Sequence, residues 1–105
     1  MPQYDVYPNP SRSAADGIPF VVVIQSDLLD ALATRLTLPL AMPSASVARA
    51  PVALCPTMVV NGKRLHALAH FAAPLPAKLL RQPVANLTAQ SSLLVAAIDA
   101  VLSGI

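Results

Sequence analysis

The 105-residue sequence has few charges, because Asp, Glu, Lys and Arg together make up only 11% of it. A soluble domain usually has about 25% charged residues, whereas this chain is 55% hydrophobic. So few charges cannot cover a monomer, and monomers rarely expose large contiguous apolar patches. We therefore expect part of the apolar surface to lie in an interface with a second subunit or another partner.

Basic residues are scarce and scattered, with a net charge of +2 and one adjacent pair, Lys63-Arg64. A nucleic-acid-binding protein gathers its basic residues on one face or along one helix. No such group accompanies this pair. The sequence therefore predicts no direct nucleic-acid partner.

The chain also lacks targeting and crosslinking features. The single cysteine, Cys55, excludes an internal disulfide. The N-terminal residues MPQYDVYPNP have neither the basic nor the apolar region of a signal peptide. The most apolar segment, residues 93–102, contains Asp99 and falls far short of the ~20 residues that span a bilayer. These features predict a cytoplasmic protein with no membrane partner.

The length predicts one domain, residues 1–105, and the patterns along it are mainly those of strands. Residues 3–7 alternate in polarity, residues 18–25 are rich in β-branched side chains, and residues 35–40 alternate with their leucines inward. The apolar run at 18–25 implies cover on both faces of its strand. Pro39 favours an edge strand or a bulge.

The strongest local pattern is residues 57–68, TMVVNGKRLHAL. Two runs suited to strands flank Asn61-Gly62, a dipeptide that tolerates the positive φ angles of a type I′ turn. The pattern therefore predicts a β-hairpin. Beyond it, Pro74 and Pro76 favour a short irregular stretch.

The last segment predicts a single helix, with Asn86 or Thr88 as its N-cap and Gly104 at its C-terminal end. Apolar residues recur along it at Leu94, Ile98, Val101 and Ile105. Such a helix packs partly on its own sheet and partly on something else. We expect a symmetric homodimer with Leu94, Ile98 and Val101 in its interface. The predicted fold is about five mostly antiparallel strands followed by a C-terminal α-helix.

No set of residues has the pattern of a catalytic, metal or cofactor site. His66 and His70 are expected on a strand, where their spacing of about 13 Å is too long for one metal ion. Cys55 has no partnered histidine spacing and is expected to fill apolar space. Asp27 and Asp30 flank leucines rather than a polar cleft, so we expect them to cap a loop. The residues alone favour a binding protein over an enzyme.

Four segments carry a more specific signal: Gln25-Ser26-Asp27-Leu28-Leu29-Asp30, Leu38-Pro39-Leu40-Ala41, Pro83-Val84-Ala85-Asn86-Leu87 and Leu102-Ser103-Gly104-Ile105. Together they resemble the CcdB family, the toxins of bacterial toxin–antitoxin (plasmid addiction) modules. The likeness covers essentially residues 4–105. It implies a small SH3-like barrel with a C-terminal helix, a fold shared with MazF-type toxins, assembled as a homodimer.

The resemblance also implies partners and contact residues. Toxins of the family bind the A subunit of DNA gyrase and trap its cleaved complex with DNA, and a labile CcdA-like antitoxin neutralises them. Leu28 and Leu29 would be exposed because they contact gyrase, in contrast to an alternative in which both tuck under the barrel. The matching positions at the helix end are Asp99, Leu102, Ser103, Gly104 and Ile105.

Ser103 departs from the pattern of the family. Known gyrase poisons of the family have Trp immediately before Gly-Ile, and this chain contains no Trp. A Trp can stack on a cation and bury about 200 Å², whereas serine does neither. Two alternatives stay open: a member that dimerises and binds antitoxin, with operon autoregulation but without poisoning gyrase, and a MazF-like endoribonuclease. The scattered basic residues disfavour the ribonuclease.

Overall fold

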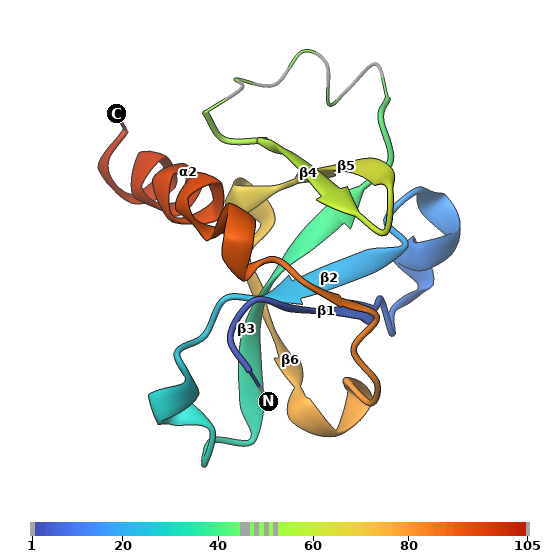
Figure 1. Ribbon diagram of the computed structural model, residues 1–105, viewed down its shortest axis with the longest axis vertical. Coiled ribbons are helices and arrows are strands. Elements are labelled where there is room, and N and C mark those ends of the chain that lie inside the picture. The colour runs from blue at the N-terminus through green and yellow to red at the C-terminus, as the bar shows by residue number, and fades with distance from the viewer. Residues whose placement is uncertain (1, 45–46, 48, 50, 52, 105) are drawn as a thin grey trace.

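The strands form an antiparallel sheet that curls into a nearly closed barrel with helix α2 packed against it (Figure 1). The computed structural model describes residues 2–44, 47, 49, 51 and 53–104. The elements are β1 (Asp5–Pro8), β2 (Phe20–Val23), β3 (Thr34–Ala41), β4 (Thr57–Val60), β5 (Lys63–Ala67), β6 (Ala73–Pro76), β7 (Ala85–Asn86) and α2 (Ser91–Ser103). Strand order is β4-β5-β3-β2-β1-β7, with β6 also paired to β3. The predicted class, mainly β with a C-terminal helix, is confirmed.

Among the seven strands that the described residues form, β6 and β7 were not predicted from the sequence. Strand β6 has the sequence APLP, and its prolines Pro74 and Pro76 lie opposite Leu36 and Thr34 of β3. Proline is tolerated there because β6 has a partner strand on one side only. Strand β7 has only two residues, too few for a periodic pattern. The expected irregular stretch therefore contains an edge strand.

The expectation that Pro39 marks an edge strand is wrong, because β3 is central. Strand β2 pairs along one side of β3, while on the other side β6 pairs as far as Thr37 and β5 pairs from Leu40 onward. Pro39 lies where the partner strand changes, and its carbonyl accepts a hydrogen bond from the Leu68 N–H at 2.9 Å. Its missing N–H therefore breaks no registered pair with β5 or β6.

Strands β4 and β5 form the predicted hairpin. Asn61 and Gly62 have φ angles of 50° and 81°, and a type I′ turn requires positive values at both central residues. Val60 pairs with Lys63 on either side of this turn. The prediction made from the Asn-Gly dipeptide is confirmed.

Helix α2 begins later than predicted and ends as predicted. Its N-cap is Gln90 rather than Asn86 or Thr88, because the 3₁₀ turn η5 (Thr88–Gln90) comes first. The Asn86 side-chain oxygen accepts a hydrogen bond from the Thr88 N–H at 2.9 Å, so Asn86 holds that turn instead. Gly104 has a φ of 73° and its N–H donates to the Ala100 carbonyl, which confirms the C-terminal glycine. Within the described residues, no helix is long and apolar enough to cross a membrane.

The main core fills the barrel, and α2 contributes to it. Its buried members are Val6, Val22, Leu38, Leu40, Met58, Val60, Leu65, Ala67, Ala69, Leu87, Leu94 and Ala97. A second cluster on the other face of the sheet contains Tyr7, Val21, Val23 and Leu80. Strand β2 thus has cover on both faces, as its apolar run predicted.

Side chains close the barrel where β4 faces the segment after β7. The Gln90 side chain accepts a hydrogen bond from the Val59 N–H and donates one to the Val59 carbonyl, both at 3.0 Å. The Asn61 side chain donates to the Val84 carbonyl at 3.1 Å. One amide side chain therefore takes the place of a paired strand residue along part of the β4 edge.

Candidate partner-binding site

The connection between β2 and β3 presents three leucines to solvent. We call residues 26–34 the leucine turn. Leu28 is 93% exposed, Leu32 53% and Leu29 47%. The exposure predicted for Leu28 and Leu29 is confirmed, and the alternative in which they tuck under the barrel is wrong. Leu32 was not predicted as a contact residue. The signal for it in the sequence is its position four residues after Leu28, as a third leucine in a short turn.

Local hydrogen bonds fold the leucine turn tightly. It starts with the 3₁₀ turn η2 (Asp27–Leu29), which Ser26 caps by accepting a hydrogen bond from the Leu28 N–H at 3.2 Å. The Asp30 N–H donates to the Asp27 carbonyl at 3.1 Å. A short polar cap before two leucines is therefore enough to turn the chain sharply at the end of β2.

The two aspartates hold this turn, as the sequence predicted. Asp27 accepts a hydrogen bond from the Gln3 N–H at 2.6 Å, which ties the turn to the start of the chain. The Asp30 carboxylate lies 3.5 Å from Nε of Arg35 and forms an ion pair with it. Both carboxylates thus serve the structure of the loop rather than an acid–base site.

Gln25 fastens the base of the leucine turn with its side-chain amide. Its Oε1 accepts a hydrogen bond from the Leu36 N–H at 2.9 Å. Its Nε2 donates to the carbonyls of Thr34 and Leu29, at 3.1 and 3.3 Å. One side chain thus links the two arms of the turn.

Arg35 lies under the turn and is only 6% exposed. Its Nη2 donates to the Asp30 carbonyl at 2.7 Å, and its Nη1 donates to the Thr34 carbonyl at 2.9 Å and to that of Leu32. Its Nε has no hydrogen bond among the described residues and only the ion pair with Asp30. The burial of Arg35 was not predicted from the sequence, because Leu75, which lies opposite it on β6, is far along the chain.

The end of α2 holds the other predicted contact residues. Leu102 is 80% exposed. The Ser103 hydroxyl donates a hydrogen bond back to the Asp99 carbonyl at 2.6 Å, so it lies along its own helix. Ile105 lies outside the described residues. A shallow hollow of about 440 Å³ is lined by Ala96, Asp99, Leu102 and Ser103. The structure therefore brings Asp99, Leu102 and Ser103 together.

A single subunit does not bring the two parts of the predicted site together. In Figure 1 the C-terminal end of α2 lies at the upper left and the leucine turn at the lower left. Because separation in a projection is also separation in space, the leucine turn and the C-terminal end of α2 lie apart in a single chain. Any partner that contacts both must reach across this gap or meet more than one copy of the chain.

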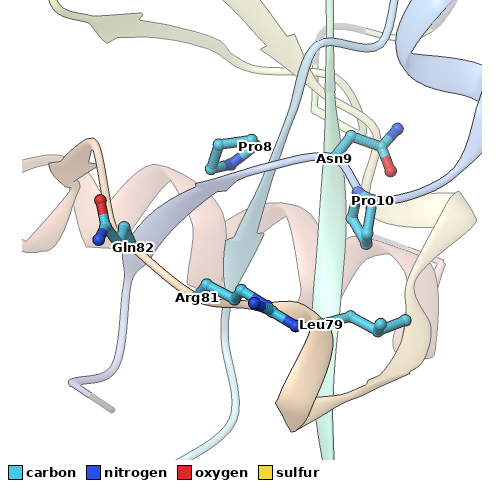
Figure 2. A pocket seen from close by; sticks show the side chains of 6 residues that line it. All are labelled: Pro8, Asn9, Pro10, Leu79, Arg81 and Gln82. Atoms are coloured by element: carbon cyan, nitrogen blue, oxygen red, sulfur yellow. The ribbon is translucent and has the colours of Figure 1, made fainter.

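Another hollow, of about 370 Å³, lies between the end of β1 and the segment after the 3₁₀ turn η4 (Ala77–Leu79) (Figure 2). It is lined by Pro8, Asn9, Pro10, Leu79, Arg81 and Gln82. Arg81 is the one charged group among these six residues, which include no carboxylate, imidazole or thiol. The hollow could hold an anionic or amide group but has no acid–base pair for catalysis.

Cys55 is buried and packs in a small cluster with Ala41 and Leu68, as predicted for a residue that fills apolar space. The structure places His70 beside it, with 3.9 Å between the Cys55 Sγ and the His70 Nδ1, which the sequence spacing did not predict. Burial raises the pKa of the Cys55 thiol. The thiol therefore stays protonated and is a poor nucleophile near neutral pH.

The two histidines lie on different elements. His66 lies on β5, and its Nδ1 is 3.5 Å from the Thr57 hydroxyl. His70 lies in the 3₁₀ turn η3 (Ala69–Phe71), so the expectation that both lie on a strand is wrong for His70. Among the residues that the structure describes, no three His, Cys, Asp or Glu side chains are placed to hold a metal ion.

The barrel, the leucine turn and α2 all fall within one match to a known family. The family model described as CcdB protein matches residues 3–104. The chain belongs to the CcdB family. No curated protein matches the chain. Membership of the CcdB family supports a toxin of a toxin–antitoxin module as the general function of this chain.

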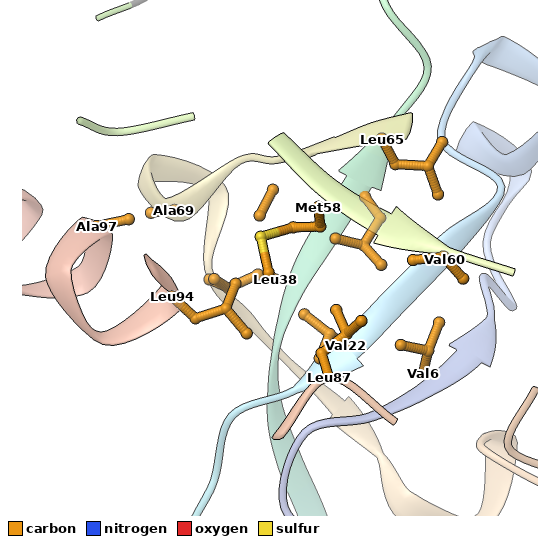
Figure 3. Close-up of a cluster of buried hydrophobic side chains, with 12 residues drawn as sticks. Val6, Val22, Leu38, Met58, Val60, Leu65, Ala69, Leu87, Leu94 and Ala97 are labelled. Carbon is orange, nitrogen blue, oxygen red and sulfur yellow. The ribbon is translucent and has the colours of Figure 1, made fainter. Parts of the chain in front are cut away.

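In this CcdB-family chain, the three residues predicted in a dimer interface differ in how deeply they are buried. Leu94 is fully buried and, with Ala97, points from α2 into the barrel core (Figure 3). Ile98 packs against the same core, whereas Val101 is 42% exposed. Leu93 and Val95 are also exposed. The dimer interface stays a prediction, but the stripe chosen from the sequence lies partly on the side of α2 that faces the barrel.

Proposed function

We propose that this chain is a homodimeric toxin that binds the A subunit of DNA gyrase and traps the cleaved complex of gyrase with DNA. A cognate CcdA-like antitoxin would neutralise it. The observation that supports this most is an exposed leucine turn in a chain that the CcdB family model matches over residues 3–104. Such a toxin acts by binding, and it needs no catalytic residue, metal or cofactor of its own.

Two apolar parts are proposed to contact gyrase. Leu28 and Leu29 contribute from the leucine turn. The helix end contributes Asp99, Leu102, Ser103, Gly104 and Ile105. Burial of an exposed leucine side chain is worth about 1.5–3 kcal/mol, and a few such anchors dominate most interfaces. Leu28 and Leu102, 93% and 80% exposed, have nearly their full side-chain area to bury.

A homodimer is proposed because one subunit keeps these two parts at separate corners (Figure 1). In a two-fold dimer every surface occurs twice, so the turn of one copy and the helix end of the other can serve the same gyrase molecule. The dimer contact is proposed on α2, where Val101 is exposed and Leu94 and Ile98 support the helix from beneath.

A second candidate function is antitoxin binding without gyrase poisoning. The Ser103 hydroxyl bonds to the Asp99 carbonyl of its own helix. It therefore offers a partner neither apolar area nor a free hydrogen-bond donor. A chain with this helix end could dimerise, bind antitoxin and repress its own operon while it binds gyrase too weakly to stop growth.

Calorimetry with the purified A subunit of gyrase separates the two functions. Three proteins are compared: the parent chain, the chain without residues 103–105, and Ser103→Trp. Under the proposed function the parent binds, the truncation weakens binding, and Ser103→Trp strengthens it by about tenfold or more, since an aromatic anchor is worth ~2 kcal/mol or more. Cleaved DNA should accumulate in the same order in a gyrase reaction.

Two results would count against this proposal. Equal binding by all three proteins means that the helix end is not the contact. No binding, even by Ser103→Trp, favours the antitoxin-binding function. Circular dichroism of each variant serves as the control, because loss of the folded barrel would remove binding for a trivial reason.

A further inference from the structure

Arg35 is buried beneath a turn that is itself exposed. Its guanidinium donates hydrogen bonds to the carbonyls of Asp30 (2.7 Å), Thr34 (2.9 Å) and Leu32. Exposed turns usually leave such carbonyls to water, and a charged group is unfavourable to bury unless it is well paired. A buried charge whose partners are three carbonyls and one carboxylate, all on a surface turn, therefore calls for a reason beyond the core.

We propose that Arg35 is a positioning residue that preorganises the leucine turn for its partner, and that Leu32 is a third contact residue beside Leu28 and Leu29. The partner is the A subunit of gyrase, so this part of the inference rests on the proposed function. A flexible loop loses conformational freedom when it binds, whereas an ordered loop has already lost it. Because Arg35 orders the turn before binding, less conformational entropy is lost on binding and the affinity for the partner is higher.

Arg35 holds the tip of the turn as well as its base, because only one of its three carbonyl partners, that of Thr34, lies at the base. Gln25 alone already links the two arms at the base through the Thr34 carbonyl and the N–H of Leu36. Arg35 adds the carbonyls of Asp30 and Leu32, which lie next to the exposed leucines. A role limited to joining β2 to β3 would not require the tip to be held.

Leu32 is positioned by the same hydrogen bonds. Its N–H donates to the Leu29 carbonyl at 3.0 Å, and its own carbonyl accepts from Arg35. Its side chain is 53% exposed. Single exposed leucines are normal on any surface, but three exposed leucines on one short ordered turn concentrate apolar side chains in one segment, as protein contacts do. The complementary surface on the partner would be an apolar pocket without charge.

Amide hydrogen exchange tests the positioning role without any partner. Arg35→Met keeps a long apolar stem and removes the guanidinium donors, whereas Arg35→Lys keeps the charge without the planar fork. We expect the amides of Leu28 and Leu32 to exchange at least about tenfold faster in Arg35→Met, and less so in Arg35→Lys. Arg64→Met, at an exposed position on β5, is the matched control and should leave the turn unchanged.

Calorimetry with the A subunit of gyrase then tests the use of this order. We expect Leu32→Ala and Arg35→Met each to weaken binding by about tenfold, while Arg64→Met leaves it unchanged. The loss caused by Leu28→Ala should be smaller in the Arg35→Met background, because an anchor on a disordered turn contributes less. If Arg35 served only the stability of the fold, Leu28→Ala would weaken binding by the same factor in the parent chain and in Arg35→Met. This holds at a temperature at which the parent chain and Arg35→Met both stay folded.

The outcomes separate this inference from the proposed function. Unchanged exchange in both Arg35 variants overturns the positioning role, and so does faster exchange with unchanged affinity in a parent chain that binds. If the parent chain does not bind the A subunit of gyrase, the proposed function fails, while exchange still confirms or overturns the ordering of the turn by Arg35. Should Arg35→Met fail to fold, Arg35→Lys carries the same comparison.

Discussion

At the scale of single residues, the leucine turn is unusual because its leucine side chains are exposed and the arginine beneath it is buried. Leu28 is 93% exposed and Arg35 is 6% exposed, although leucine is usually among the most buried residues and arginine among the most exposed. This arrangement is possible because the carbonyls of Thr34 and Asp30 accept hydrogen bonds from the two Nη atoms of the guanidinium. It leaves the leucine side chains of the turn outside the core of the barrel.

The buried side chain of Tyr7 makes the free energy of unfolding depend on pH. Burial, and next the negative charge of Asp5, raise the pKa of the Tyr7 phenol above its ordinary value. The Tyr7 hydroxyl lies 3.5 Å from the Asp5 carboxylate, to which it donates. Above about pH 10 the unfolded chain loses this proton while the folded chain keeps it. The stabilisation is therefore complete below that pH and is lost as the pH rises through the folded-state pKa.

We expect the free energy of unfolding to fall from about pH 9 to 11 in the parent chain and to fall less in Tyr7→Phe. Urea titrations across this range measure the difference. Burial also raises the pKa of the Cys55 thiol, which acts in the same sense at lower pH. Both proteins should therefore carry Cys55→Ala. The same decline with and without the Tyr7 hydroxyl would contradict the prediction.

Residues whose surroundings are local could be predicted, and those whose surroundings come from distant segments could not. Asp27 and Asp30 flank Leu28 and Leu29 in the chain, so their role in holding the loop could be predicted from adjacent residues, whereas the exposure of the two leucines was predicted only from the resemblance to the CcdB family. The burial of Arg35 depends on β6, which follows it by a long stretch of chain. No pattern within residues 35–40 contains that information.

The same distinction holds for whole elements. The β4–β5 hairpin could be predicted because one dipeptide determines its turn. Strand β6 could not, because two of its residues are prolines and only pairing with β3 makes it a strand. The start of α2 was predicted too early because Gln90, which bonds to β4, is the last residue of a 3₁₀ turn that Asn86 holds and that precedes the helix. Tertiary contacts decide each of these boundaries.

Gln90 joins two elements, and its removal should loosen the barrel. Its side chain makes two hydrogen bonds with Val59 on the edge of β4. We expect Gln90→Ala to lower the free energy of unfolding by about 1–2 kcal/mol, because each hydrogen bond contributes about 1 kcal/mol. Gln90→Glu should lose part of this, since a carboxylate still accepts from the Val59 N–H but cannot donate to its carbonyl.

Chemical denaturation measures both variants, with Gln82→Ala as the control. Gln82 is exposed, and no hydrogen bond of its side chain is found among the described residues. Its replacement should change the free energy of unfolding by less than about 0.5 kcal/mol. If the Gln90 and Gln82 variants lose the same small amount, the side-chain closure of the β4 edge contributes nothing to stability.

For the molecule as a whole, the low charge content corresponds to many exposed apolar side chains, and two segments that lie apart carry more than half of the large ones among the described residues. The exposed apolar residues of these segments are Leu28, Leu29 and Leu32 on the leucine turn and Leu93, Val95, Val101 and Leu102 on α2. The two segments lie apart in Figure 1. Composition alone predicted that an interface exists but could not show on which segments the exposed apolar side chains lie.

This division predicts that the two segments can be disrupted independently. We expect the parent chain to sediment at micromolar concentration at twice its chain mass of 10.9 kDa. Val101→Asp should dissociate it, because two-fold symmetry places the new charge close to its own copy. Leu28→Asp, the same kind of change on the leucine turn, should leave the dimer intact. Both residues are exposed, so neither variant should unfold the protein.

Analytical ultracentrifugation over a range of concentrations distinguishes the outcomes, since the dimer fraction follows mass action. A parent chain that stays at the single-chain mass would exclude the dimer. A dimer that survives Val101→Asp but not Leu28→Asp would move the dimer contact from α2 to the leucine turn. The turn would then be covered in the dimer, and its leucines could not serve as gyrase anchors. The sedimenting mass therefore tests the proposed roles of Val101 in the dimer and of the leucine turn in gyrase binding, because a side chain that is covered in the dimer cannot also contact gyrase.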